Sequence, residues 1–292
     1  MEYRITHTTK YIYPQPVSLC HNVAKLLLRN TQGQYCKQSS VEIIPQPDVL
    51  QEYPDYFGNK VIYFAIQKQH NELSVTIHSK VERSTTHDTI LHFYKDTPWE
   101  KVPVMLLEPG NENFDARQYI YETPYTKITN EIAQYAQQSF MPGRPVFEAA
   151  NDLMFRIYSD FEFNPGFTTV ATPLSKVMAT RKGVCQDFAH LALACFRAVG
   201  LPARYVSGYI ETLPPEGKEK LVGVDASHAW FSVFIPNSGW VDFDPTNNVI
   251  PGMQHITIGW GRDYSDIAPL KGVIQSSGEH GLTVAVDVRR VS

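Results

Sequence analysis

Three side chains of the sequence have the types and spacing that thiol catalysis requires. The first, Cys185, opens the apolar stretch CQDFAHLALACFRAVG, which has helical periodicity and follows Gly183 at a tight turn. A cysteine attacks as the thiolate, and the first turn of a helix favours an anion through its unpaired N–H groups and its macrodipole. Arg181 and Lys182 add positive charge just before it. The pattern indicates a nucleophile at Cys185, with a small buried side chain as the alternative interpretation.

A thiol nucleophile also needs an imidazole base and a carboxylate that orients the imidazole. Of the ten histidines, His228 opens the strand-like HAWFSVFIP after a long polar loop, and Asp244 follows sixteen residues later in GWVDFDPTN. Two adjacent antiparallel strands can bring these two residues side by side. Asp242 lies on the same strand face as Asp244 and is therefore the competing partner. His190 is about 140° round the helix from Cys185, so it is expected to point elsewhere.

The elements that must position these residues are helices followed by strands. Thr129 is a plausible N-cap for NEIAQYAQQSF, Pro145 begins VFEAANDLMFRIYSDF, and a short helix starts at 172–173. The helix that begins at Cys185 is expected to end at Gly200, a good residue just beyond a helix. The strands ARYVSGYIE, HAWFSVFIP and GWVDFDPT follow. This order predicts an α+β core in which helices pack on an antiparallel sheet.

The first part of the chain has the pattern of a sheet protein. YRITHTTKYIY, SSVEIIPQP, KVIYFAIQ and LSVTIHSKVERS are separated by turn signals, with no helical pattern between them. We expect an N-terminal antiparallel β-sandwich domain over 1–110. The proline-rich stretch 96–125 is expected to be an irregular linker, and the tail HITIGWGRDYSDIAPLKG is also expected to be irregular. The core is expected over 111–292, with GLTVAVDVRRV as its C-terminal strand.

Composition and charge exclude several classes of partner. Hydrophobic residues make up 43% of the 292 residues, which is ordinary for a folded soluble protein. A formal net charge of −4 offers no basic surface for nucleic acid or anionic lipid. No stretch approaches the ~18 apolar residues of a spanning helix, and the N-terminus does not resemble a signal peptide. We therefore expect a cytoplasmic protein with neither a nucleic-acid nor a membrane partner; the sequence gives no signal for an oligomeric state.

The cysteines do not predict a disulfide framework or a zinc site. There are four of them, Cys20, Cys36, Cys185 and Cys195, and no two form a C-x-x-C pair. Zinc ligation by Cys185, His228 and the aspartates at 242 and 244 would lack local pairs such as H-E-x-x-H. Cys195 lies among alanines in the middle of the helical stretch and is expected in the core. We expect no metal and no cofactor.

The segments GVCQDFAHLALACFRAVGLPARYVSGY and HAWFSVFIPNSGWVDFDPTN together resemble the transglutaminase-like, papain-type core, over roughly residues 155 to 250. In that superfamily a Cys–His–Asp triad is spread over three such segments, and the motifs place it on Cys185, His228 and Asp244. The strand-rich first part resembles the N-terminal β-domain of bacterial members, and GWGRDYSDIAPLKG resembles their end segment.

The resemblance implies a thiol enzyme that acts on an amide or peptide bond through a thioester at Cys185. A cysteine peptidase or amidase is favoured, because the extra C-terminal β-domains and calcium-binding insertions of the eukaryotic cross-linking enzymes are missing. Two alternatives stay open: a protein-glutamine acyl transferase that uses an amine acceptor, and a non-catalytic peptide-binding module that keeps the fold. The expected partner is a peptide or protein substrate, or a small amide.

The remaining site residues are predicted less directly. The backbone N–H of Cys185 could stabilise an oxyanion, and Gln186 and Asn164 are candidates for a second donor. Gln186 could equally be a solvent-facing helix residue. The aromatic residues expected near the cleft are Tyr209, Trp230 and Trp240. Packing around the triad is the alternative interpretation for the two tryptophans.

Overall fold

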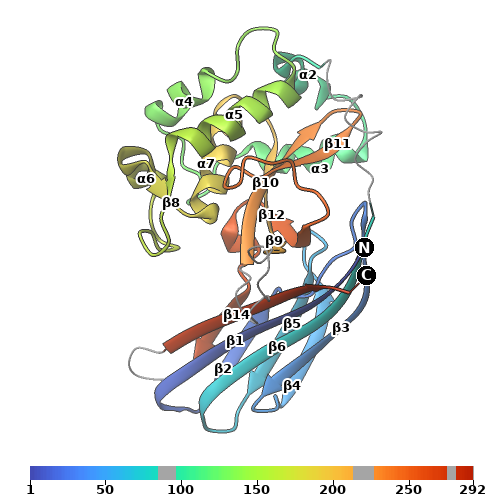
Figure 1. Cartoon of the computed structure of the whole chain (residues 1–292), viewed down its shortest axis with the longest axis vertical. Coiled ribbons are helices and arrows are strands. Elements are labelled where there is room, and N and C mark those ends of the chain that lie inside the picture. The colour runs from blue at the N-terminus through green and yellow to red at the C-terminus, as the bar shows by residue number, and fades with distance from the viewer. Residues whose placement is uncertain (85–96, 213–226, 275–280, 292) are drawn as a thin grey trace, which may run out of the picture.

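The computed structural model describes residues 1–84, 97–212, 227–274 and 281–291. Figure 1 shows an elongated part made of strands and, above it, a part in which helices surround a smaller sheet. Apart from one short parallel pair the sheets are antiparallel, so the predicted α+β class is confirmed. Among the described residues no helix is both long and apolar enough to cross a membrane.

The strand-built part is a sandwich of two four-stranded sheets. One sheet has the order β14 (Gly281–Arg290), β1 (Glu2–Val17), β6 (His70–Arg83) and β3 (Gln34–Ile44). The other has the order β13 (Leu270–Ile274), β2 (Cys20–Ala24), β5 (Lys60–Ile66) and β4 (Val49–Pro54). Leu73 and Val75 of one sheet pack with Ile62 and Phe64 of the other in a shared apolar cluster. The predicted N-terminal sandwich is present, with β2 and β4 as strands that the sequence pattern missed.

The last two strands of the chain belong to this sandwich, whereas they were expected within the core range 111–292. β14 pairs with β1 from Tyr3↔Arg290 to Ile12↔Gly281, and β13 pairs with β2. The two chain ends consequently lie close together where the two parts of the molecule meet (Figure 1). Alternation in GLTVAVDVRRV identified a strand correctly, but a strand's local pattern carries no information about which distant strand it will pair with.

The stretch expected to be an irregular linker contains short helices instead. They are η1 (Trp99–Lys101), α2 (Val102–Met105), α3 (Asn111–Arg117) and η2 (Gln118–Ile120). Val102, Leu106 and Ala116 are buried in the core cluster. Residues on both sides of the expected boundary at 110 therefore pack on the core. Pro103 lies in the first turn of α2, a position where proline begins a helix rather than breaking it.

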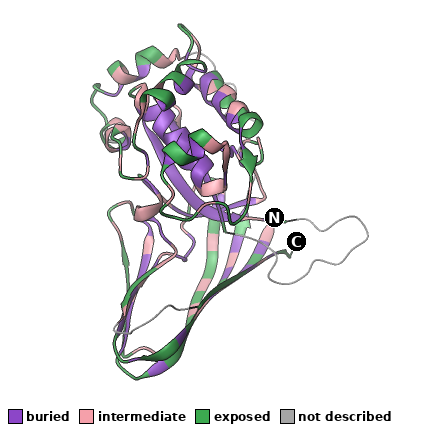
Figure 2. Ribbon diagram, turned by 90° about the vertical axis from the view of Figure 1, so that its left-hand side faces the viewer, coloured by how far each residue is buried: buried purple, intermediate pink, exposed green. Residues whose placement is uncertain are grey.

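Four longer helices form one layer of the core: α4 (Asn130–Gln137), α5 (Val146–Asp160), α6 (Leu174–Thr180) and α7 (Cys185–Ala198). Thr129 caps α4 as predicted, since its side chain accepts from the Ile132 N–H. Pro145 is the N-cap of α5 rather than its first residue. α7 is followed by Gly200 in the left-handed region, at φ +76°. Helix α7 is buried almost throughout its length (Figure 2). This is the burial expected for a helix that is apolar on all sides.

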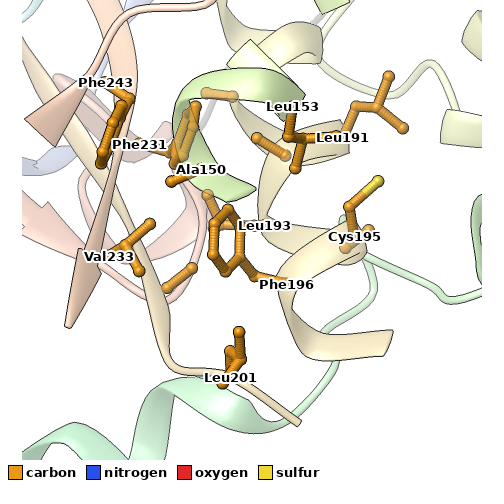
Figure 3. Packing of buried hydrophobic residues seen from close by; sticks show 14 of the residues in the cluster. Ala150, Leu153, Leu191, Leu193, Cys195, Phe196, Leu201, Phe231, Val233 and Phe243 are labelled. Carbon is orange, nitrogen blue, oxygen red and sulfur yellow. The ribbon is translucent and has the colours of Figure 1, made fainter. Parts of the chain in front are cut away.

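The core sheet has the order β11 (Gly239–Phe243), β10 (Ser227–Ile235), β9 (Ala203–Ile210) and β12 (His255–Gly261). Phe231 and Val233 of β10 pack against α7 around Phe196 (Figure 3). β12 lies in the tail that was expected to be irregular. Its alternation is interrupted by a register shift between Thr257 and Gly259, which is why the period-two pattern was not evident. A short 3-10 turn, η3 (Tyr264–Asp266), follows it.

A separate apolar cluster joins the core sheet to the sandwich. Tyr3 and Val288 of the sandwich pack with Tyr209 and Ile256 of the core sheet. The sheet is therefore covered by α7 on one face, while its other face turns towards the sandwich (Figure 2).

Candidate active site

The turn that delivers Cys185 is held by three segments of chain. β7 (Glu162–Phe163) pairs in parallel with β8 (Lys182–Gly183), which immediately precedes the turn. A Cβ on Gly183 would lie 3.0 Å from the Asp187 side chain, so glycine permits this close approach. The Asp187 carboxylate accepts from the Val184 N–H at 2.9 Å and from the Thr168 hydroxyl at 2.6 Å. These contacts fix the start of α7, where a half-buried Cys185 is the first helical residue.

His228 lies between the thiol and a carboxylate. It is the second residue of β10, and its Nε2 is 2.7 Å from Asp244 Oδ2. The Cys185 thiol lies close enough to the same imidazole to raise its pKa. Because Nε2 is engaged by Asp244, the nitrogen that remains for the thiol is Nδ1. The structure therefore brings together the three residues that the sequence pattern singled out.

Of the two aspartates that competed for His228, Asp244 makes the contact. Asp242 is still within β11, paired with Ser232, and its Oδ2 accepts from the indole N–H of Trp230 at 3.0 Å. Asp244 lies just beyond β11 and pairs with Val249 in an isolated bridge. The two aspartates contact His228 and Trp230, which alternate on one face of β10, so the position along the strand decides which of them reaches His228.

Asp244 is fully buried and accepts hydrogen bonds on both carboxylate oxygens. Oδ1 accepts from the backbone N–H groups of Thr246, at 2.9 Å, and Asn247, at 3.3 Å. Oδ2 lies 2.7 Å from Asn247 Nδ2, 2.7 Å from His228 Nε2 and 3.0 Å from His255 Nε2. Burial would raise the pKa of Asp244, but the contacts with the two histidines outweigh it and hold that pKa well below its usual range. The carboxylate is therefore ionised.

The electrostatics of His228 favour the imidazolium. Burial alone would lower its pKa, but the hydrogen bond with Asp244, followed by the effect of the nearby Cys185 thiol, raises the pKa of His228 to about 10. An imidazolium beside a thiol stabilises the thiolate, which is the nucleophilic form. The first-turn N–H of Cys185 has no acceptor within its own helix, so it is available to an oxyanion.

His255 is a site residue that sequence reasoning missed, because it lies in the tail expected to be irregular. It opens β12 and, from the opposite side of β9, contacts the same Oδ2 of Asp244 as His228 does. Its Nδ1 is buried and has no hydrogen-bond partner among the described residues. The usable signal was its position at the start of a strand, like that of His228.

The two imidazoles and the carboxylate also form a donor set that zinc accepts. Their ligating atoms, from His228, Asp244 and His255, lie within 4.8 Å of one another. In the structure both imidazoles instead form hydrogen bonds with Asp244 Oδ2.

The two candidates for a second oxyanion donor both adjoin the turn that carries the nucleophile. Gln186 is half-buried on the first turn of α7. Asn164 donates from its backbone N–H to the Gly183 carbonyl at 2.9 Å, while its Nδ2 donates to Glu162 at 3.1 Å. The Asn164 backbone thus supports the nucleophile turn and its amide is already engaged, so the oxyanion role of both residues stays a prediction.

The three aromatic residues expected near the cleft lie in different surroundings. Tyr209 is buried between the core and the sandwich, and its hydroxyl lies 2.9 Å from His7 Nδ1. Trp230 is buried, with its ring centroid 6.0 Å from that of His228. Trp240 lines a cavity between the two parts of the molecule, and Cys185 is not among the residues around that cavity. Tyr209 is enclosed by residues of the core sheet and the sandwich, such as Ile256 and Tyr3, and its cleft role stays a prediction.

Comparison with known proteins agrees with this geometry. Residues 3–82 match the family described as the bacterial transglutaminase-like N-terminal region, and residues 133–245 match the transglutaminase-like superfamily. An uncharacterised protein of Mycobacterium tuberculosis (strain H37Rv) is 39% identical over 98% of this chain and 92% of its own length. A protein-glutamine gamma-glutamyltransferase of Pseudomonas aeruginosa is 41% identical over 97 residues, which are 31% of this chain and 14% of that protein.

Among solved structures, a proposed cysteine protease from Cytophaga hutchinsonii superposes with a TM-score of 0.76 at 21% identity, covering 99% of this chain and 90% of that one. This likeness shows that the sandwich and the core occur together in one fold. The chain, with its thiol, imidazole and carboxylate on three successive motifs of the core, belongs to the transglutaminase-like superfamily and carries the N-terminal region of its bacterial members.

Proposed function

We propose that this protein is a thiol enzyme that hydrolyses an amide or peptide bond, as a cysteine peptidase or amidase. The observation that carries the proposal is the position of His228, which forms a hydrogen bond with the buried Asp244 and lies close enough to Cys185 for the thiol to raise its pKa. A structural role would not require a charged imidazole between a half-exposed thiol and an ionised carboxylate.

The mechanism follows from these positions. The Cys185 thiolate attacks the amide carbonyl carbon, a C–S bond forms, and the oxyanion accepts from the Cys185 N–H. The His228 imidazolium gives its proton to the leaving nitrogen as the C–N bond breaks, leaving a thioester and a neutral imidazole. Neutral His228 then takes a proton from water, which attacks the thioester. Collapse releases the carboxylic acid and restores the thiolate and the imidazolium. Asp244 holds the imidazole in one orientation throughout.

Acyl transfer is the second candidate. The observation that favours it is the local similarity to a protein-glutamine gamma-glutamyltransferase, which extends over 97 residues. In that reaction a primary amine takes the place of water in the second step, and the same His228 accepts its proton. The triad is compatible with both outcomes, since they differ only in the nucleophile that reaches the thioester.

The proposed partner is a peptide or protein, or a small amide. The proposed compartment is the cytoplasm, where the four free cysteines would remain reduced. Fractionation of producing cells, with the protein detected by antibody, tests the compartment; recovery of the protein from the periplasm or medium would contradict it.

The experiment that tests the function incubates the full chain with a library of glutamine- and asparagine-containing peptides, with and without a fluorescent primary amine. Mass spectrometry follows new peptide ends, deamidation and amine incorporation. Hydrolysis that is unaffected by the amine supports the peptidase or amidase, whereas dominant incorporation of the amine supports transfer. Cys185→Ala should abolish either reaction, and Cys195→Ala is the matched control. Slow, equal alkylation of all four cysteines in the wild-type protein would contradict both reactions. The remaining interpretation would then be a non-catalytic peptide-binding module.

A further inference from the structure

A large cavity lies between the core sheet and the sandwich. Its volume is about 870 Å³, within the usual range of sites for small molecules. Arg29 and Arg83 line it from the sandwich side, and Arg204 and Trp230 line it from the core sheet. Trp230 alternates with the residues that pack on α7, so the cavity is on the sheet face opposite to that helix. Neither Cys185 nor His228 is among its lining residues.

Three guanidinium groups of the cavity lack a carboxylate partner. Arg83 and Arg204 are each only 9% exposed, and Arg29 is half-buried. Arg29 donates to the Phe57 carbonyl and the Asn59 side chain, and Arg83 donates to two backbone carbonyls. Within the described part of the chain no carboxylate oxygen lies within 4.0 Å of any of the three. Buried charges of this kind are costly unless they are paired.

Arg204 is the most exceptional of the three. Its guanidinium carbon lies 3.7 Å from the ring centroid of Trp260 and 4.3 Å from that of Trp240, and Arg29 stacks on Trp260 at 3.4 Å. Among the described residues its guanidinium has no hydrogen-bond partner, and its Nε is fully buried. Stacking occupies the faces of a guanidinium and leaves its N–H edge free. A planar fork of this kind suits the two oxygens of a carboxylate or a phosphate.

The acidic residues of the cavity do not neutralise this charge. Asp242 is half-buried and accepts from the Trp230 indole, while Glu112 and Asp115 are exposed at the rim on α3. Burial lowers the pKa of Arg204 to about 10, and Asp242 acts in the opposite direction, so the guanidinium stays charged at neutral pH. The interior therefore holds an excess of positive charge.

We propose that this cavity is a binding site for a small anionic ligand, whose carboxylate or phosphate oxygens accept from the free N–H edge of Arg204. The body of the ligand lies against the exposed part of Trp240. The inference concerns a second site and does not depend on the reaction at Cys185.

The position of the cavity connects it to the triad. His255 lines it, and the same ring contacts Asp244 Oδ2 at 3.0 Å. Trp230 packs edge-on against His255 with ring centroids 5.3 Å apart. A bound ligand would therefore lie directly behind the carboxylate that orients His228.

The test titrates the full chain with two probes, inorganic phosphate and citrate, at constant ionic strength, with sodium chloride as the reference salt. Three of the four tryptophans line the cavity, so tryptophan fluorescence should respond to binding, and calorimetry gives the affinity. We expect saturable binding of at least one probe with a Kd of about 1 mM or tighter. Preference for phosphate would identify a phosphorylated ligand, and preference for citrate a carboxylate; either result supports the site.

Arg204→Gln should weaken this binding at least tenfold. Arg204→Lys keeps the charge but loses the planar fork, and Arg29→Gln removes a neighbouring charge; both should weaken binding by less, and they carry the test if Arg204→Gln does not fold. Arg289→Gln, at an exposed arginine on β14, is the matched control and should bind like the wild type. Cys185→Ala should also bind normally, which separates this result from the fate of the proposed reaction. Absence of saturable binding, or equal binding by the Arg204 and Arg289 variants, would overturn the proposal.

Discussion

The first turn and the middle of α7 each present a cysteine, in different surroundings. Cys195 is fully buried beside apolar residues such as Leu191 (Figure 3), and burial raises the pKa of its thiol to about 12. Cys185 is half-exposed, begins the helix and lies close to His228. The residue type and the helix are the same. The difference therefore comes from the helix terminus and from an imidazole that is supplied by a distant strand.

Alkylation rates test most directly whether Cys185 and Cys195 differ in reactivity. With iodoacetamide at neutral pH we expect Cys185 to react about a hundredfold or more faster than Cys195, because only its surroundings favour an exposed thiolate. Peptide mapping by mass spectrometry after short exposures measures both rates in one sample. Cys20, which is buried in the sandwich, serves as a second slow reference. Comparable rates for the two cysteines of α7 would refute the difference.

The contribution of the carboxylate can be isolated with two neighbouring aspartates. Asp244→Asn should slow alkylation of Cys185 roughly tenfold or more, because His228 loses the partner that most raises its pKa. Asp242→Asn is the matched control, since Asp242 bonds to Trp230 instead, and it should change the rate little. Similar effects of both substitutions would mean that Asp244 does not specifically support the reactivity of Cys185.

The pH dependence of stability tests the charged groups that distinguish the surroundings of Cys185 from those of Cys195. The raised pKa of His228 contributes stability that is fully present below pH 6.5 and is lost as the pH rises through about 10. The lowered pKa of Asp244 contributes stability that is present above pH 3.8 and is lost at more acidic pH.

The free energy of unfolding of the wild type, measured in urea, should therefore exceed that of His228→Gln most clearly between about pH 4 and 6.5. The excess should shrink by at most a few kcal/mol towards pH 10. A difference that stays constant over this range would show that the pair does not titrate as a unit.

The smallest effect is expected at the buried cysteine. Cys195→Ala should cost about 1 kcal/mol, for a small cavity, and Cys195→Ser somewhat more, for an unpaired hydroxyl. Neither change should alter the alkylation rate of Cys185. Urea unfolding measures the stability change, and the alkylation assay measures the rate at Cys185. A changed alkylation rate of Cys185 would show that the environments of Cys185 and Cys195 are coupled.

Short-range signals in the sequence predicted a large part of this arrangement. Gly183 before an apolar helical run predicted the turn and helix that present Cys185, and Gly200 marked the end of that helix. Alternation predicted the long strands of the sandwich, β1 and β6, because a half-buried strand repeats every two residues. β2 and β4 are short, and β12 contains a register shift, so their patterns were too weak to be recognised.

What the sequence determined by itself is the local conformation around Cys185, His228 and Asp244, since helix starts, strand starts and turns depend on neighbouring residues. Tertiary structure alone decided which distant groups meet. It placed β13 and β14 in the sandwich, chose Asp244 over Asp242, and brought His255 to the same carboxylate. These outcomes depend on strand pairing and on burial of charge across the whole chain, which local periodicity does not record.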